Sequence, residues 1–289
     1  MTPAGSQVDF SRRIECVSAV SNVPVLEISG VTKVYESRSA GALPALHDLS
    51  LRLESGDVFG LVGLNGAGKS TTNKIILGFT KPSSGSATVC GHSAGTRSAR
   101  HSIGYLPENL VLDEALTGSE TLDYMARLSG VTPGVSPGVS PGVAVPTAIR
   151  RTELVAQVGL EAAEHRAVRG SSRGMRQRLG IATAFIHDPR LLILDEPFSG
   201  LDPRGRRMLR ELVLKARDHG VAVLLTTHQL LEAQELCSRF GILHKGRLLG
   251  IWTREEVQDS RTGTSLEHFF LETLRLQVAS GDLADGPLV

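Results

Sequence analysis

Three short hydrophobic runs give the chain its most regular pattern. They are VFGLVG at 58–63, LLILDE at 191–196 and VAVLLTTH at 221–228. Each run opens with residues that are almost all apolar, which is typical of strands buried on both faces of a sheet. Between the last two runs, residues 203–220 have the spacing of a helix with proline in its first turn. Strands that alternate with helices predict an α/β fold with a mainly parallel sheet.

The regions around these runs differ in character. Residues 1–23 are polar and aperiodic, so we expect a flexible N-terminal extension. VLEISGVTKVY at 25–35 and LSLRL at 49–53 have the composition and alternation of strands. Residues 105–188 lack such runs and contain helical patterns, which predicts an inserted helical subdomain. Within it, residues 132–143 form a low-complexity Pro-Gly-Val repeat, either a flexible tether or a neutral expansion of a surface loop.

Composition narrows the possible functions. The 31 Lys and Arg residues nearly balance the 30 Asp and Glu residues, and the net charge of +1 argues against nucleic acid or an anionic membrane surface as a partner. The three cysteines form no CxxC pair, which favours a reducing cytosol over a disulfide framework. The first residues lack the apolar core of a signal peptide, and no apolar run reaches the roughly 18 residues of a membrane span. We therefore expect a cytoplasmic chain that is soluble on its own.

The segment GLNGAGKST, residues 63–71, carries the strongest chemical signal. It matches G-x-x-x-x-G-K-S between a predicted strand and a predicted helix, the context in which backbone N–H groups wrap a phosphate. Lys69 is expected to reach the β- and γ-phosphates, and the Ser70 hydroxyl to ligate Mg²⁺. The segment therefore predicts binding of a nucleoside triphosphate with Mg²⁺. The residues expected to hold it are Gly63, Asn65, Gly66, Gly68, Lys69, Ser70 and Thr71.

Two adjacent acids end the second hydrophobic run and supply the other half of a hydrolytic site. Asp195 stands at the end of a predicted strand, where its carboxylate can hold Mg²⁺ through water opposite Ser70. Glu196 can orient and polarise the attacking water, which a metal-binding aspartate alone does not do. A strand that ends in an ordinary charged turn is the alternative, but two acids directly after an apolar run favour catalysis.

Taken together, these motifs resemble the nucleotide-binding subunit of ATP-binding-cassette (ABC) transporters over roughly residues 25–250. SGLD at 199–202 is similar to the family's D-loop, which implies a nucleotide contact for Asp202. His228, at the end of TTH, matches the family's switch histidine, a catalytic residue that contacts the γ-phosphate. Tyr35 lies where the family stacks an aromatic ring on adenine; without the resemblance, it would be a half-buried strand residue.

The resemblance also implies a fold and a division of the chain. The fold is a P-loop NTPase (ABC ATPase) core with a mainly parallel sheet, an antiparallel β-subdomain and an inserted α-helical subdomain. The ATPase domain is expected over residues 24–250, and a C-terminal helical tail over residues 251–289. ATP and Mg²⁺ are the ligands that the family implies.

The segment SSRGMRQR, residues 171–178, stands where the family has its signature loop, usually LSGGQxQR. In that family two subunits pack head to tail, and each signature loop closes on the ATP held by the other subunit. Ser172 can cap the helix that follows, whose free N–H groups favour a γ-phosphate, so Ser172 and Gly174 are expected nucleotide contacts. An ordinary capped helix is the alternative. Arg173 departs from the pattern, and it either adds a cation near phosphate or faces solvent.

A second departure is Glu108 in GYLPE. The family's Q-loop usually carries a glutamine there, which contacts Mg²⁺ and the nucleophilic water. A carboxylate can still ligate Mg²⁺, but it adds a negative charge beside the γ-phosphate, so the role of Glu108 stays open. GYLPE, the variant signature and the tail segment LEHFFLETL resemble the subgroup that serves ABC-2-type exporters.

The resemblance implies an ATPase subunit that works as a dimer with itself. It would be attached to the inner face of the cell membrane through a separately encoded permease and would power export. Two alternatives are an ABC ATPase without a transport role and a non-hydrolysing regulatory subunit. A single cassette without heptad runs counts against the first, and an intact phosphate loop followed by both acids counts against the second. The cargo is not encoded in any motif that we identify.

Overall fold

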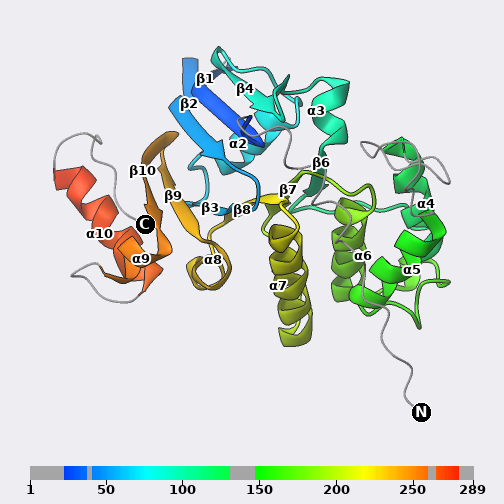
Figure 1. Ribbon diagram of the computed structural model, residues 1–289. Helices are drawn as coiled ribbons and strands as arrows, with labels where there is room; N and C mark the ends of the chain where they lie inside the picture. The colour runs from blue at the N-terminus through cyan, green and yellow to red at the C-terminus, as the bar shows by residue number, and fades with distance from the viewer. Residues whose placement is uncertain (1–22, 38–40, 131–146, 260–264, 280–289) are drawn as a thin grey trace.

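The computed structural model describes residues 23–37, 41–130, 147–259 and 265–279. Two sheets and a group of helices make up the molecule, with the six-stranded sheet at its centre (Figure 1). The extension expected at 1–23, apart from Val23, and the Pro-Gly-Val repeat at 132–143 lie outside the described residues.

The six-stranded sheet has the order β10–β9–β3–β8–β7–β6. The pairings from β9 to β6 are parallel, and β10 runs antiparallel to β9. The mainly parallel sheet predicted from the hydrophobic runs is confirmed. Because parallel strands point the same way, their carboxyl ends meet at one edge of the sheet. The strands are β3 (Val58–Val62), β6 (Ile103–Leu106), β7 (Leu191–Asp195), β8 (Ala222–Thr227), β9 (Arg239–His244) and β10 (Arg247–Thr253).

Both faces of this sheet are buried, which explains why its strands read as uninterrupted hydrophobic runs. Along β3, Val58 and Val62 belong to one apolar core, whereas Phe59 and Leu61 belong to another. β7 and β8 divide their side chains between the same two cores in alternation. Helices α6, α7 and α8 contribute to the first core, and α2 contributes to the second.

A four-stranded antiparallel sheet with the order β2–β1–β4–β5 covers the second core (Figure 1). Helix α2 (Lys69–Ile76) packs against this sheet through Ile75 and Ile76, which share a core with Leu46 and Leu49 of β2. This sheet confirms the expected antiparallel β-subdomain. Its strands are β1 (Leu26–Ser37), β2 (Gly41–Leu53), β4 (Ser84–Val89) and β5 (His92–Ser93), and the short helix α3 (Arg97–His101) follows them.

Three helices group together at one side of the sheets (Figure 1). They are α4 (Gly118–Leu128), α5 (Thr147–Gln157) and α6 (Arg173–Phe185), with a short 3₁₀ turn at Val168–Gly170 before α6. Leu122, Leu154 and Leu179, one from each helix, share the first core. β6 overlaps the start of the range 105–188, in which no strand was expected. The sequence analysis missed β6 because IGYL is too short to form a recognisable run.

The remaining helices follow the sheet strands. α7 (Pro203–Asp218) confirms the helix predicted there with proline in its first turn, and α8 (Leu230–Leu236) lies between β8 and β9. α9 (Arg254–Gln258) and α10 (Leu266–Ala279) come after β10. Since β10 extends to Thr253, the segment expected to be a helical tail from residue 251 begins as a strand. Trp252 of β10 packs edge-on against Phe269 of α10, with ring centroids 5.2 Å apart.

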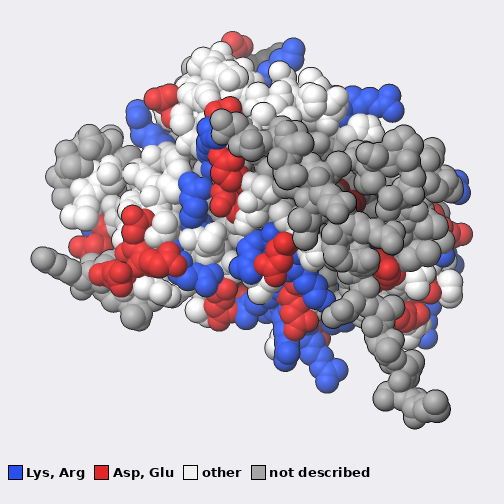
Figure 2. Space-filling model, in the orientation of Figure 1, with Lys and Arg blue, Asp and Glu red and all other residues white. Residues whose placement is uncertain are grey.

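In the described ranges, no helix is both long enough and apolar enough to cross a membrane. On the face shown in Figure 2, acidic and basic side chains are interspersed over α7 and α8. Arg207 pairs with Glu211 at 2.9 Å, and Arg210 pairs with Glu232 at 2.9 Å. These pairs compensate opposite charges on α7 and α8, in keeping with the net charge of +1.

Candidate active site

The phosphate loop connects the end of β3 to the start of α2. Gly68 caps α2 with a φ of +114°, which a residue with a side chain rarely adopts. A Cβ at Gly63 would lie 2.3 Å from the carbonyl oxygen of Leu243, and one at Gly68 would lie 2.8 Å from that of Ala45. Both positions therefore require glycine. The first turn of α2 holds no acidic residue, so the positive potential of its N-terminus is not cancelled there.

Lys69 is the first residue of α2, and its side chain turns back towards the loop. Its Nζ donates to the carbonyl oxygen of Gly63 at 2.6 Å and to that of Leu64 at 3.2 Å. Burial lowers the pKa of Lys69, while the charges of nearby acids, Glu196 above all, oppose this shift. The ammonium therefore lies in the field of the acids that the sequence assigned to the same site.

Asp195 ends β7 and is tied to two neighbouring elements. Thr226 of β8 donates its hydroxyl to Asp195 Oδ1 at 2.6 Å, and the Asn73 amide of α2 donates to Thr226 Oγ1 at 3.0 Å. Burial raises the pKa of Asp195, and the Thr226 and Asn73 side chains oppose the rise. Sequence reasoning missed Asn73 and Thr226, because a threonine in an apolar strand and an asparagine in a helix carry no signal of their own.

Glu196 follows Asp195 directly and is held by the end of β8. Its carboxylate accepts hydrogen bonds from the Thr227 hydroxyl at 2.9 Å and from the backbone N–H of His228 at 2.9 Å. His228 Nδ1 lies 2.7 Å from Glu196 Oε1. The Glu196 side chain is 7% exposed, whereas the imidazole of His228 is 52% exposed. The acid is therefore buried behind a histidine that faces solvent.

The acids and the phosphate loop share one cavity of about 160 Å³. The predicted residues Glu108, Asp195 and Glu196 all line it, although 87 residues of sequence separate the first two. Ala45 of β2 also lines the cavity, and nothing in the sequence pointed to it. The predicted residues that the structure brings together here are Asn65, Gly66, Gly68, Lys69, Ser70, Thr71, Glu108, Asp195 and Glu196.

Tyr35 does not line this cavity. It lies on β1 opposite Leu43 of β2, and its side chain is exposed. Lys33 Nζ lies 4.9 Å from the centre of the tyrosine ring, within the range of a cation–π contact. The stacking of Tyr35 on adenine therefore stays a prediction.

The signature segment also lies outside the cavity. Ser172 is the N-cap of α6, and its hydroxyl accepts from the N–H of Met175 at 3.3 Å, which agrees with the predicted cap. A Cβ at Gly174 would lie 3.4 Å from the carbonyl oxygen of Gly200, so α6 starts beside the SGLD turn of the same chain. Ser172 and Gly174 thus do not line the cavity that contains Lys69.

Asp202, expected to contact nucleotide, is a helix cap. Its Oδ1 accepts from the Gly205 N–H at 2.7 Å and from Arg178 Nη2 at 3.0 Å. The bond from Gly205 N–H is the main reason that the pKa of Asp202 is lowered, and the charge of Arg178 adds to it. The structure therefore gives Asp202 a structural role, and a nucleotide contact stays a prediction.

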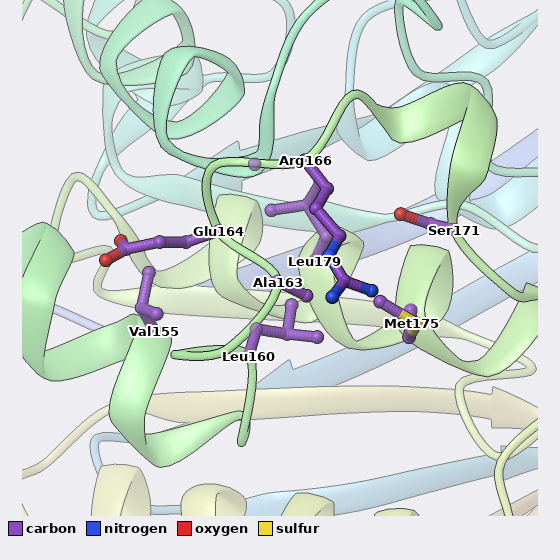
Figure 3. A pocket seen from close by; sticks show the side chains of 9 residues that line it. Val155, Leu160, Ala163, Glu164, Arg166, Ser171, Met175 and Leu179 are labelled. Atoms are coloured by element: carbon purple, nitrogen blue, oxygen red, sulfur yellow. The ribbon is translucent and has the colours of Figure 1, made fainter.

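A second hollow is lined by residues of α4, α5 and α6 and of the segment before α6 (Figure 3). Val155, Leu160 and Leu179 line it together with Glu164 and other residues. It encloses about 10 Å³, room for about one water molecule. It is therefore too small for a nucleotide or a transported molecule.

Comparison with known proteins identifies the family. Residues 46–199, more than half of the chain, match the family model described as ABC transporter. An uncharacterised ABC transporter ATP-binding protein of Bacillus subtilis, YhcH, is 38% identical over 85% of this chain and 74% of its own length.

Two other relatives have names that state a role. The Nod factor export ATP-binding protein I of Cupriavidus pinatubonensis is 35% identical over 87% of this chain and 74% of its own length. The daunorubicin/doxorubicin resistance ATP-binding protein DrrA of Streptomyces peucetius is 36% identical over 81% of this chain and 67% of its own length.

Two solved structures share the fold. One, the ATP-binding subunit of an ABC transporter, is 32% identical and superposes with a TM-score of 0.75 over 86% of this chain and 99% of the other. The second, a post-hydrolysis dimer of an ATP-binding cassette bound to ADP and Pi, is 23% identical with a TM-score of 0.66 over 79% of this chain and 98% of the other, and it supports the fold alone. The chain therefore belongs to the ABC transporter family, as an ATP-binding and ATP-hydrolysing subunit.

Proposed function

We propose that this ATPase acts as a head-to-tail pair of copies and drives a separate membrane permease. The observation that carries the proposal is the placement of the two predicted halves of the site. Lys69 and Glu196 line one cavity, whereas Ser172 and Gly174 lie outside it at the start of α6. A signature segment that lies outside the cavity of its own chain is free to close on a nucleotide held by a second copy.

The residues of the cavity fit a magnesium ion. Ser70, Glu108 and Asp195 offer a hydroxyl and two carboxylates, the oxygen ligands that Mg²⁺ takes. Among the described residues, no three His, Cys, Asp or Glu side chains lie together as a group that could hold a metal ion. Phosphate oxygens of the substrate and water would complete the shell, as is usual for Mg²⁺. The ion would neutralise charge that develops on the phosphates.

Glu196 is our candidate for the general base. Its carboxylate is fixed by Thr227 and by the backbone of His228, so it can accept a proton from an attacking water without first reorienting. His228 uses Nδ1 towards Glu196, which leaves Nε2, on the other edge of the ring, as the atom for the γ-phosphate. Lys69 would exchange its two loop carbonyls for phosphate oxygens.

The direction of transport is inferred from the relatives. Two are named for Nod factor export and for daunorubicin and doxorubicin resistance, and both cover most of this chain. We infer that this subunit also powers export, attached to the inner face of the membrane through its permease. The two names concern unlike molecules, so they leave the cargo of this system unassigned.

Mixing two inactive variants tests the shared site. Lys69→Ala disables the phosphate loop, and Ser172→Arg blocks the signature segment, so each pure dimer contains only damaged sites. A hybrid of the two has one site with both defects and one site with none. With equal mixing, about half the dimers are hybrids, so about a quarter of wild-type ATPase activity is expected to return.

Lys74→Ala serves as the control, because Lys74 is exposed on the same helix as Lys69. Lys74→Ala should be fully active alone. Its mixture with Ser172→Arg should show no more ATPase activity than the Lys74→Ala chains contribute by themselves. ATP-dependent association of the hybrid is measured alongside hydrolysis, in case both sites must act together. If mixing Lys69→Ala with Ser172→Arg restores neither activity nor association, the head-to-tail site is wrong.

A further inference from the structure

Arg173 joins the start of α6 to the turn that follows Glu196. Its Nη2 donates to Ser199 Oγ at 3.0 Å. The rest of the side chain covers Gly200: a Cβ built there would lie 2.9 Å from Arg173 Nε and 3.2 Å from both Cγ and Cδ. Gly200 has a φ of +75°, so its bare face is a fixed feature of the turn. The guanidinium therefore both donates a hydrogen bond and packs on this glycine.

Two more residues of α6 hold the same turn. Gln177 Nε2 donates to the carbonyl oxygen of Pro197 at 3.0 Å, and this bond is buried. Arg178 Nη2 donates to Asp202 Oδ1 at 3.0 Å. Residues 197–202 are thus held along one side of α6, and Arg173 makes the contact nearest to the N-terminus of the helix.

The same turn is hydrogen-bonded to Glu196. The Ser199 N–H donates to the carbonyl oxygen of Glu196 at 3.1 Å, and Glu196 has a φ of +46°. A residue with a side chain stays in that region only when the surrounding contacts hold it there. Arg173 is therefore connected to Glu196 through one intervening residue, Ser199.

The sequence left two roles open for Arg173, a cation near phosphate and a side chain in solvent. The residue is exposed, in keeping with the second role, but its guanidinium bonds Ser199 of the same chain, outside the cavity around Lys69. We propose that Arg173 is a positioning residue that holds the Ser199–Gly200 turn, and with it Glu196, in the orientation required for hydrolysis. This inference rests on the proposed role of Glu196.

A double-mutant cycle tests the connection. Arg173→Ala and Ser199→Ala should each lower kcat by about tenfold and leave the KM for ATP within about twofold, because the contact orients the base and does not bind substrate. The double variant should be no slower than the slower single variant, since both substitutions remove one interaction. Melting temperatures should match the wild type, because the bond is exposed.

Two further variants separate positioning from a general defect. Arg173→Lys keeps a donor on a long side chain and should recover about half of the lost rate. Arg207→Ala removes an exposed arginine of α7, one that bonds Glu211 at 2.9 Å, and it should keep wild-type kcat. Arg207 is the control because its ion pair lies on α7, outside both the signature segment and the Ser199 turn.

Three outcomes would overturn the proposal. The first is an Arg173→Ala variant with a raised KM for ATP and an unchanged kcat, which would place Arg173 on the phosphate. The second is a double variant whose defect equals the product of the two single defects, and the third is wild-type kinetics for Arg173→Ala. An active Glu196→Gln variant would instead refute the role of Glu196 itself, so the two failures can be told apart.

Discussion

Glu196 has a strained backbone conformation, and hydrogen bonds hold its side chain in place. Its φ of +46° places a non-glycine residue in the left-handed region, at a cost of roughly 1–3 kcal/mol. Three groups at the end of β8 hold its carboxylate, and its own N–H donates to the carbonyl oxygen of Thr226 at 2.9 Å. The strain therefore persists because the ends of β7 and β8 fix the residue on both sides.

Glu196→Gln is expected to bind ATP and to lose turnover by at least about 100-fold. Glutamine can keep the bond from the His228 N–H at Oε1, and its amide NH2 takes the place of Oε2 beside the Thr227 hydroxyl, but neither group can take a proton from water. ATP should therefore persist in the site, and the variant should accumulate as an ATP-dependent dimer. Steady-state ATPase assays and size-exclusion chromatography with and without ATP measure the two effects.

Glu211→Gln is the control for Glu196→Gln, because Glu211 is exposed on α7 and pairs only at the surface with Arg207. It should hydrolyse ATP at the wild-type rate. Near-normal hydrolysis by Glu196→Gln would exclude Glu196 as the base.

At the scale of elements, the phosphate loop is shaped by what packs against it. Gly63 lies against the backbone of β9, where a Cβ would come within 2.3 Å of the Leu243 carbonyl oxygen. That contact involves main-chain atoms of a central sheet strand, which cannot move aside as a flexible side chain can. The loop and β9 are therefore fitted to each other.

Gly63→Ala is expected to destabilise the protein by about 1–3 kcal/mol and to weaken ATP binding, because the loop must shift away from β9. Chemical denaturation measures the stability, and fluorescent ATP analogues measure the binding. Gly170→Ala is the matched control, since a Cβ there meets no atom within 4 Å. Equal stability and affinity for the two variants would show that the loop tolerates a side chain at Gly63.

At the scale of the whole molecule, the proposed function places the chain at a membrane through a permease. No helix among the described residues is long and apolar enough to span a bilayer. The net charge of +1 offers little attraction to anionic lipid.

We expect the chain to sediment with membranes only when its proposed permease partner is produced with it. Lys69→Ala should attach equally well, because that substitution disables the phosphate loop and leaves the outer surface unchanged. Fractionation followed by immunoblotting measures the distribution. Sedimentation with membranes in the absence of any partner would contradict the proposed arrangement.

The sequence by itself determined the features that depend on contiguous residues. The uninterrupted hydrophobic runs identified β3, β7 and β8, because strands buried on both faces have no polar alternation. The phosphate loop and the pair Asp195–Glu196 could be recognised in the sequence because their chemistry requires fixed residues at fixed spacing. The strand β6 was missed because four residues carry too little pattern.

Only the tertiary structure decided which distant residues meet. β8 lies between β3 and β7, and this order brings Asn73, Thr226 and Asp195 into one chain of hydrogen bonds. Arg173 contacts Ser199, which is 26 positions away in the sequence, and His228 contacts Glu196, which is 32 positions away. The hydrophobic pattern predicts whether a residue is buried or exposed, but many strand orders are compatible with the same pattern. The partners of these polar side chains follow from the strand order that the whole core selects.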